Sequence, residues 1–538
     1  MKDYKINFLF CLIFLFSYDL FAQSLKDGVT SSIADLNNIK AQITNNGGVG
    51  EGITILWDNP QRISNEKNIV YDMGLQIAGK INGEIVSAFS QWSKTYSPGP
   101  ILDGKAAMIS HPENQSKYRV YKILKGDDSS NPDYAEWPVE YGAPVDNFGN
   151  PLMLGDENLY CVYNSFHDAV PTAYPYLMNL KSIPIEIHQY TYSLKPANAN
   201  SIMNDVMFME YLIINKGDAQ IDSMNIGFWA DVDFYDGGSI YNNNIPAVDV
   251  QRNLGYCWSE IDTAETMVAV GVTQLFGPLA NELNSNATFK GKTVNNKKNL
   301  PLSAFHGILD DATNQLYLGP ISDNQHVWYY ANGLDKDGNE ILNPITNQAT
   351  KFPFDGDPVA NSGWIWNNDS LHLGGGAGFT IFSGNFTLAS NDTQWVMYAL
   401  VPAIGKTGKD AIVDLRNRVD SLQSLSYNEI IITAVKDDNK SLTSLPDKFW
   451  LSQNYPNPFN PSTTIKYSIP LVEKQNFVPV QLKVYDILGR EVATLVNEQK
   501  AAGNYEVKFD ASDMASGIYL YKLQVKEFMQ TRNMILLR

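Results

Sequence analysis

Three aspartates in one glycine-containing segment form the pattern in this sequence that best suits metal binding. Asp231, Asp233 and Asp236 lie two and three residues apart, and two glycines follow directly. Carboxylates in such a loop can converge on one hard cation, and Ca²⁺ takes about six to eight oxygen ligands. Backbone carbonyls and Asp249 would complete the set. The sequence therefore predicts a calcium site at Asp231, Asp233, Asp236 and Asp249, with a solvated acidic turn as the alternative.

Cys161 and Cys257 are the second candidate pair. Both lie in strand-like apolar runs, at residues 159–163 and 256–258. A disulfide between them would close a long loop and stabilise the fold by roughly 4–5 kcal/mol in the chain-entropy model. Each cysteine could equally be a buried free thiol. The spacing alone leaves both alternatives open, because it does not reveal the Cα separation that a disulfide requires.

The rest of the sequence lacks the familiar catalytic motifs. It contains no G-x-S-x-G elbow, no H-E-x-x-H pair and no phosphate-binding glycine loop. Glu186 and His188 share one face of an expected strand and would suit a metal, although a polar strand face explains them as well. Paired carboxylates for glycoside hydrolysis leave no local pattern. A secreted hydrolase acting on polysaccharide or protein is therefore the alternative to a binding or structural protein.

These residues lie among short apolar runs separated by turns, a pattern that indicates a mainly β protein. Residues 208–214 and 224–229 are expected to be neighbouring strands, with the aspartates in the loop that follows. One helix is expected after a cap at Asp410, because apolar residues recur at spacings of three and four up to Leu422. Its polar face would carry Arg418, and the helix would pack on the strand at residues 394–401. The expected fold class is antiparallel β-sandwich domains with one late helix.

Composition supports buried cores and excludes one class of partner. The chain of 538 residues is 44% hydrophobic and 12% aromatic, and its formal net charge is −18. So acidic a chain argues against nucleic acid as a partner. It is compatible with divalent cations, and Ca²⁺ is the one cofactor that the sequence suggests.

The first 22 residues have the layout of a secretory signal peptide. Lys2 and Lys5 precede an apolar run at residues 8–16, and Ala22 offers a cleavage position. The run is too short to span a bilayer. Cleavage would remove Cys11 and leave no transmembrane segment. The expected order is a signal peptide at 1–22, a β-rich cargo at 23–428, a linker at 429–452 and a C-terminal module at 453–538. The cargo is expected to be one domain, or two with a boundary near residue 200.

The C-terminal module carries four motifs in order. They are Asn454-Tyr-Pro-Asn-Pro-Phe-Asn-Pro461, Val484-Tyr-Asp-Ile-Leu-Gly-Arg-Glu-Val492, Gly517-Ile-Tyr-Leu-Tyr-Lys-Leu523 and Met534-Ile-Leu-Leu-Arg538. Together they resemble the type A C-terminal sorting domain of the type IX secretion system of Bacteroidetes. The resemblance implies secretion to the outside or the outer cell surface, with the type IX machinery as partner. It implies motif roles for Asn457, Pro458, Phe459, Asn460, Pro461, Gly489, Arg490, Gly517 and Tyr519. Alternating runs between turns predict a small sandwich of immunoglobulin type.

A second, broader resemblance covers the cargo. It rests on the G-x-W-x-D-x-D stretch at residues 227–233, on residues 253–256, and on Asp355-Gly-Asp-Pro-Val359 with the Gly363-Trp364 pair. These stretches are similar to large, uncharacterised secreted proteins that carry the same sorting domain, and they imply no known activity. The sequence thus predicts a secreted or surface protein whose cargo is a binding or structural module, with a glycan or another surface ligand as its partner.

Overall fold

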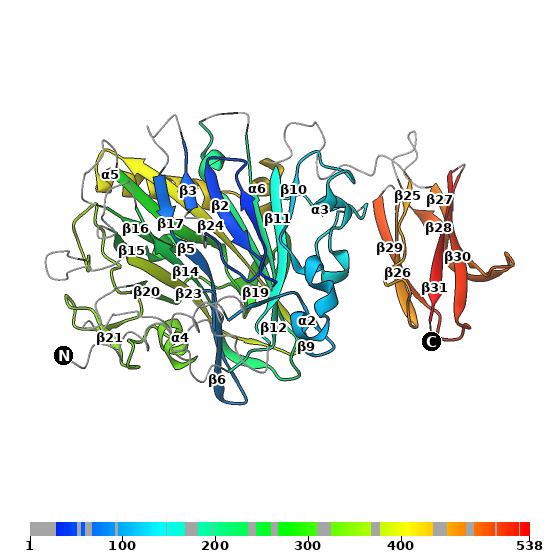
Figure 1. Cartoon of the computed structure of the whole chain (residues 1–538), viewed down its shortest axis with the longest axis horizontal. Helices are drawn as coiled ribbons and strands as arrows, with labels where there is room; N and C mark the ends of the chain where they lie inside the picture. The colour runs from blue at the N-terminus through cyan, green and yellow to red at the C-terminus, as the bar shows by residue number, and fades with distance from the viewer. Residues whose placement is uncertain are drawn as a thin grey trace, which may run out of the picture. The chain divides into compact units, whose positions relative to one another are not determined.

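The computed structural model describes residues 28–50, 55–59, 67–91, 95–146, 148–166, 181–196, 198, 200–234, 244–259, 267–308, 324–366, 377–433, 449–469, 478–500, 503–526 and 528–537. The chain divides into two compact units (Figure 1). The larger unit, the cargo, comprises residues up to 143 and 153–434, and the smaller comprises 144–152 and 435–538. The expected signal peptide and Asp236 lie outside the described residues.

Two large antiparallel sheets build the cargo. Within the described residues, the first has nine strands in the order β10-β11-β12-β13-β24-β17-β16-β15, with β7 paired to β11, and the second has five in the order β20-β23-β14-β5-β6. The strands of the first are β7 Ser97–Pro98, β10 Tyr121–Leu124, β11 Glu157–Asn164, β12 Ile185–Ser193, β13 Met207–Asn215, β15 Ile245–Asp249, β16 Leu254–Trp258, β17 Met267–Phe276 and β24 Thr393–Gly405. Those of the second are β5 Asp72–Ile81, β6 Glu84–Phe89, β14 Ile221–Val232, β20 Ala304–Ile308 and β23 Ala377–Leu388.

The two sheets pack face to face as a β-sandwich (Figure 1). The ring centroid of Phe228 in β14 lies 4.7 Å from that of Tyr398 in β24. Since side chains alternate along a strand, Trp395 points to the opposite face of the nine-stranded sheet. There the ring of Tyr427, in α6 (Tyr427–Thr433), lies 5.4 Å from that of Trp395. The nine-stranded sheet is therefore covered on both faces at β24, and β12, two strands away, is buried along its whole length.

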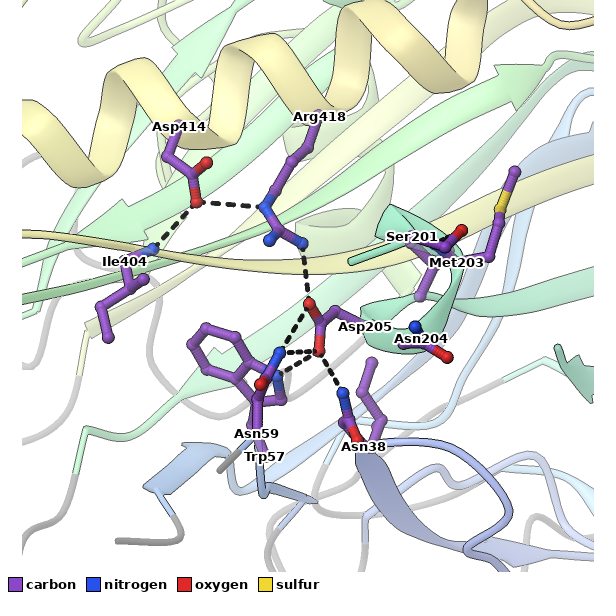
Figure 2. Close-up of polar contacts among 12 residues, drawn as sticks. Asn38, Trp57, Asn59, Ser201, Met203, Asn204, Asp205, Ile404, Asp414 and Arg418 are labelled. Carbon is purple, nitrogen blue, oxygen red and sulfur yellow. Dashed lines mark hydrogen bonds and ion pairs between the residues drawn. The ribbon is translucent and has the colours of Figure 1, made fainter. Parts of the chain in front are cut away.

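A smaller sheet of β1 (Ser31–Ala34), β2 (Ile39–Thr44), β3 (Ile55–Trp57) and β4 (Lys67–Val70) is tied to the sandwich by buried carboxylates, among them Asp205. Figure 2 shows Asp205, the last residue of η3 (Ile202–Asp205), accepting hydrogen bonds from Asn38, Trp57 and Asn59 and pairing with Arg418. The prediction of a subdomain boundary near residue 200 is therefore wrong. Strands on both sides of that position, such as β12 and β13, also pair within one sheet.

The expected helix is present as α5 (Gly408–Gln423), with two corrections. Its N-cap is Thr407, whose hydroxyl accepts from the Asp410 N–H while the Asp410 carboxylate accepts from the Thr407 N–H. This is a capping box, so Asp410 is its third residue and not the cap. Arg418 is buried, not solvent-facing, because Asp205 pairs with it. The helix packs on β24, as expected, and also on β17.

The smaller unit is a two-sheet β-sandwich in its described residues. One sheet has the order β25-β26-β29 and the other β28-β27-β30-β31. Inward residues alternate along β30, where Tyr519, Tyr521 and Leu523 are buried. The mainly β fold class is confirmed, while the immunoglobulin type stays a prediction. The bounds are β25 Trp450–Leu451, β26 Ser462–Ile469, β27 Val478–Tyr485, β28 Glu491–Lys500, β29 Gly503–Asp510, β30 Gly517–Val525 and β31 Phe528–Leu536.

The remaining elements of the cargo lie around the two sheets. They are β8 Ile101–Leu102, β9 Lys105–Ala106, α2 Ala107–Ser110, η1 Pro112–Tyr118, α3 Pro132–Ala135, η2 Val139–Tyr141, η4 Val250–Arg252, β18 Leu279–Phe289, β19 Lys292–Asn299, α4 Asn324–Ala331, β21 Ile341–Leu342 and β22 Ala349–Thr350. Of the helices in the described residues, none is both long and apolar enough to cross a membrane. Because α6 extends to Thr433, the linker expected from residue 429 begins later than predicted.

Candidate functional site

The predicted calcium ligands are only partly brought together. Asp231 lies within β14, not in the loop after it, because it pairs with Asp72 of β5 and Gly378 of β23. Asp233 follows two residues later, just beyond the strand. Burial and the neighbouring Asp231 carboxylate raise the pKa of Asp233 to about 7. Two acidic groups thus lie close enough to repel each other at one end of the five-stranded sheet, and such a pair would favour a cation.

Asp249 is engaged by arginines instead. Its Oδ2 lies 2.9 Å from Nη1 of Arg252 and 3.3 Å from Nε of Arg416, so its charge is already balanced. In the part of the chain that the structure describes, no three His, Cys, Asp or Glu side chains gather to hold a metal ion. Asp236 is outside that part. A calcium site at Asp231, Asp233 and Asp236 therefore stays a prediction, and Asp249 is a poor candidate for its fourth carboxylate.

Cys161 and Cys257 are both buried free thiols, so the disulfide alternative is wrong. They lie in β11 and β16 of the same sheet, with β12, β13, β24 and β17 between these strands. At about 4.8 Å per strand, that separation is roughly 24 Å. A disulfide needs Cα atoms within about 7 Å. Burial raises the pKa of both thiols, which makes them poor nucleophiles.

Glu186 and His188 form a hydrogen-bonded chain with a residue that the sequence did not suggest. Nε2 of His188 lies 3.0 Å from Oε1 of Glu186, and Nδ1 lies 2.7 Å from the hydroxyl of Tyr160. Burial alone would raise the pKa of Glu186, but the hydrogen bond and charge of His188 hold it below its ordinary value. Both ring nitrogens are occupied, so this histidine does not offer a ligand atom to a metal in this arrangement.

A pocket of about 380 Å³ opens between the β18–β19 hairpin and the junction of α5 with α6. Its walls come from four places in the chain. Asn253 follows η4, Leu275 and Phe276 end β17, and the hairpin contributes Thr288, Gly291 and Thr293; Leu422, Gln423, Leu425, Ser426, Tyr427, Asn428 and Ile430 complete the lining. Gly291 has φ +74°, and a Cβ there would lie 2.5 Å from Oδ1 of Asn428. Glycine is thus what lets the hairpin approach α6 so closely.

A buried carboxylate holds the aromatic wall of this pocket. Glu210 of β13 accepts hydrogen bonds from the Trp395 indole at 3.0 Å and the Tyr192 hydroxyl at 3.2 Å, and it also bonds the Tyr427 hydroxyl. Burial raises the pKa of Glu210, although these donors work against that rise. The sequence shows none of this, because the four residues are far apart in the chain. The alternation of side chains along β13 indicates only on which face of the sheet Glu210 lies.

In the C-terminal unit, the first motif is fastened to the last strand. The Phe459 N–H donates to the Ile535 carbonyl at 2.9 Å, and the Leu537 N–H donates back to the Phe459 carbonyl at 3.0 Å. Oδ1 of Asn457 accepts from the Ile535 N–H at 2.8 Å. The ring of Phe459 is buried against Phe509. The opening motif and the final strand therefore form one folded structure.

The second and third motifs shape turns. Gly489 has φ +78° in the turn between β27 and β28, where the Asp486 carboxylate accepts from the Arg490 backbone and side chain. Gly517 starts β30, and the Tyr519 hydroxyl donates to the Ala515 carbonyl at 2.7 Å.

Residues 453–537 match the family model of the secretion system C-terminal sorting domain. The tail is a type IX secretion sorting domain. The sorting domain supports export by the type IX system and a secreted or cell-surface location.

Comparisons of the cargo are far less informative. No curated protein matches the chain significantly. Among solved structures, a polysaccharide lyase and a putative kojibiose phosphorylase from the human microbiome resemble it at 8% sequence identity, with TM-scores of 0.17 and 0.24. Each alignment covers 66% of this chain but only 35% and 32% of those proteins, so the chain spans about a third of their length. Likeness this distant says nothing of what this chain binds or acts on.

Proposed function

We propose that this chain is an extracellular binding protein, delivered by type IX secretion, whose β-sandwich cargo holds a ligand at or beyond the outer cell surface. The observation that carries the proposal is the folded sorting domain at residues 453–537. Its first and last motifs are hydrogen-bonded to each other, since Phe459 pairs with the last strand. The signal peptide expected at residues 1–22 would supply the first membrane crossing.

The cargo supports a binding role through its pocket. The described residues that line the pocket include no Asp, Glu, Lys, Arg or His. General acid–base chemistry needs ionisable groups within reach of the reacting atoms. The described lining offers hydrogen bonds and aromatic surface, which suit holding a ligand and not transforming it. Ca²⁺ at Asp231, Asp233 and Asp236 is a second part of the proposal and would stabilise the same unit.

Cell fractionation tests the export proposal. The full chain and a chain lacking residues 453–538 would be expressed in a host with a working type IX system. We expect the full chain in the medium or on the surface and the shortened chain in the periplasm. Surface appearance of the shortened chain, at a level comparable with the full chain, would show that another segment directs export.

A further inference from the structure

The pocket beside α6 has the chemistry of a site for an uncharged polar ligand. Its described lining combines amides at Asn253, Gln423 and Asn428 with the hydroxyl-bearing residues Thr288 and Thr293. Amide and hydroxyl groups can both donate and accept hydrogen bonds, as the hydroxyls of a saccharide do. The volume of about 380 Å³ lies in the range of ~300–1,000 Å³ that small-molecule sites occupy.

Two of these amides are oriented by the protein and keep one polar atom available. Gln423 donates through Nε2 to the Arg252 carbonyl at 2.6 Å, which leaves its Oε1 as an acceptor. Asn253 accepts from the Leu302 N–H at 3.0 Å through Oδ1, so its Nδ2 has no partner among the described residues. Asn428 is exposed at the start of α6. The pocket thus presents donors and acceptors whose directions are partly set before a ligand arrives.

The aromatic wall is equally well held. The ring of Tyr427 lies 6.1 Å from that of Phe276 and 5.4 Å from that of Trp395, in both cases edge to face. The hydroxyl of Tyr427 is fixed by the buried Glu210 carboxylate. Of these rings, that of Phe276 is partly exposed at the pocket, and the electron-rich face of an aromatic ring favours contact with the C–H groups on the apolar side of a sugar. A wall that does not need to be ordered on binding loses less entropy.

From these features we propose that the pocket binds the end of a neutral saccharide. This inference rests on the proposed binding function and names its ligand class. An anionic saccharide would bring a carboxylate or sulfate for which the described lining offers no cation. A peptide end would likewise bring a charged amine or carboxylate without a partner, and burying an unpaired charge is costly. Uncharged sugar hydroxyls bring no unpaired charge into the pocket and so avoid both costs.

Calorimetric titration of the full chain tests the proposal. The probes are neutral oligosaccharides of glucose, mannose, galactose and N-acetylglucosamine, with oligosaccharides of uronic acids as the charged comparison. We expect at least one neutral probe to bind and the uronic acids to bind much more weakly. Failure of every neutral probe to bind at millimolar concentration, or binding of uronic acids alone, would overturn the assignment.

Substitutions of residues that line the pocket test whether the saccharide binds there. Asn428→Ala and Gln423→Ala should each weaken binding about 3- to 10-fold, since each removes one hydrogen-bonding group. Asn417→Ala is the matched control, because Asn417 is exposed on α5 but does not line the pocket. Tyr427→Phe keeps the ring but frees it from Glu210, so it should weaken binding while leaving the preference for neutral probes unchanged. Unchanged affinity in both Asn428→Ala and Gln423→Ala would move the site elsewhere and refute the proposal.

Chromatography of the titrated mixtures separates this inference from the proposed function. An intact saccharide after long incubation supports both. A shortened saccharide whose binding still depends on Asn428 and Gln423 would contradict the binding-only function but keep the pocket assignment. Absence of binding, with export unaffected, would overturn the pocket assignment alone.

Discussion

The guanidinium of Arg418 lies 3.1 Å from the carboxylate of Asp205, and both side chains are buried (Figure 2). Nε of the same guanidinium lies 3.0 Å from Asp414 on the preceding helical turn. The ion pair joins α5 to η3 and, through the other donors to Asp205, to the small N-terminal sheet. This contact spans 213 residues of sequence and is one reason that the cargo behaves as a single unit.

Removing one partner of that pair should be costly. We expect Arg418→Met to lower the free energy of unfolding by about 3–5 kcal/mol, because it leaves the Asp205 carboxylate buried without its counter-charge. Chemical denaturation of the full chain measures this. Lys409→Met, at an exposed position of the same helix, is the control and should change stability by less than ~0.5 kcal/mol. Equal effects of the two substitutions would contradict a role for the pair.

The raised pKa of Asp233 predicts a pH dependence of stability. Its folded pKa of about 7 lies above the unfolded value of about 3.9, so between these values the folded state binds more protons than the unfolded state. The contribution of this group to stability therefore falls as the pH rises from about 4 to 7. Asp233→Asn should remove that loss and stabilise the chain at pH 8 relative to wild type, by on the order of 1–3 kcal/mol, with little effect at pH 4. An equal difference between the two chains at both pH values would show that Asp233 is not perturbed.

Calcium binding by the segment from Asp231 to Asp236 predicts a rise in melting temperature on addition of Ca²⁺. If Ca²⁺ binds the folded chain only, a concentration 100 times the Kd stabilises it by about 2.7 kcal/mol. We expect millimolar Ca²⁺ to raise the melting temperature of the wild type and not that of Asp231→Ala or Asp233→Ala. Asp337→Asn, an exposed acidic residue in another turn, should keep the shift. The calcium prediction fails if wild type shows no shift.

Two exposed apolar residues in the sorting domain predict where the export machinery makes contact. Ile487 and Leu488, at the turn between β27 and β28, are each 73% exposed. Their turn is held by Asp486 and Arg490, so they contribute little to the core. Replacing both with serine should leave the melting temperature unchanged and reduce the fraction of chain outside the cell. Leu283→Ser, 83% exposed in the cargo, is the control and should export normally.

The parts of this structure that the sequence predicts are those encoded locally. Alternating apolar residues and turn glycines predict the strands, and consecutive motifs predict the sorting domain. The true N-cap of α5 was also readable, since a threonine three residues before Asp410 resembles a capping box. Arg418 was misplaced because helical periodicity marks a polar residue as exposed. Only its partner in η3 makes burial favourable.

The pocket could not be predicted from the sequence, because its residues come together only in the folded chain. Asn253 and Asn428 line it from distant parts of the chain, and Gly291 matters only because α6 lies against it. Glu210 receives its donors from β12, β24 and α6. Such a site depends on the order of strands in a sheet, which local patterns do not specify. The calcium loop was proposed from spacing alone, and the pairing of Asp231 within β14 changed its expected geometry.

A reporter fusion tests whether the C-terminal module alone directs export by the type IX system. Residues 449–538 would be joined to the C-terminus of a periplasmic reporter enzyme, and external protease would then be applied to intact cells. An export role for this module predicts that the reporter reaches the surface or the medium in a strain with type IX secretion, and stays protected in an otherwise identical strain without it. A fused reporter that remains in the periplasm of the secretion-competent strain would contradict it.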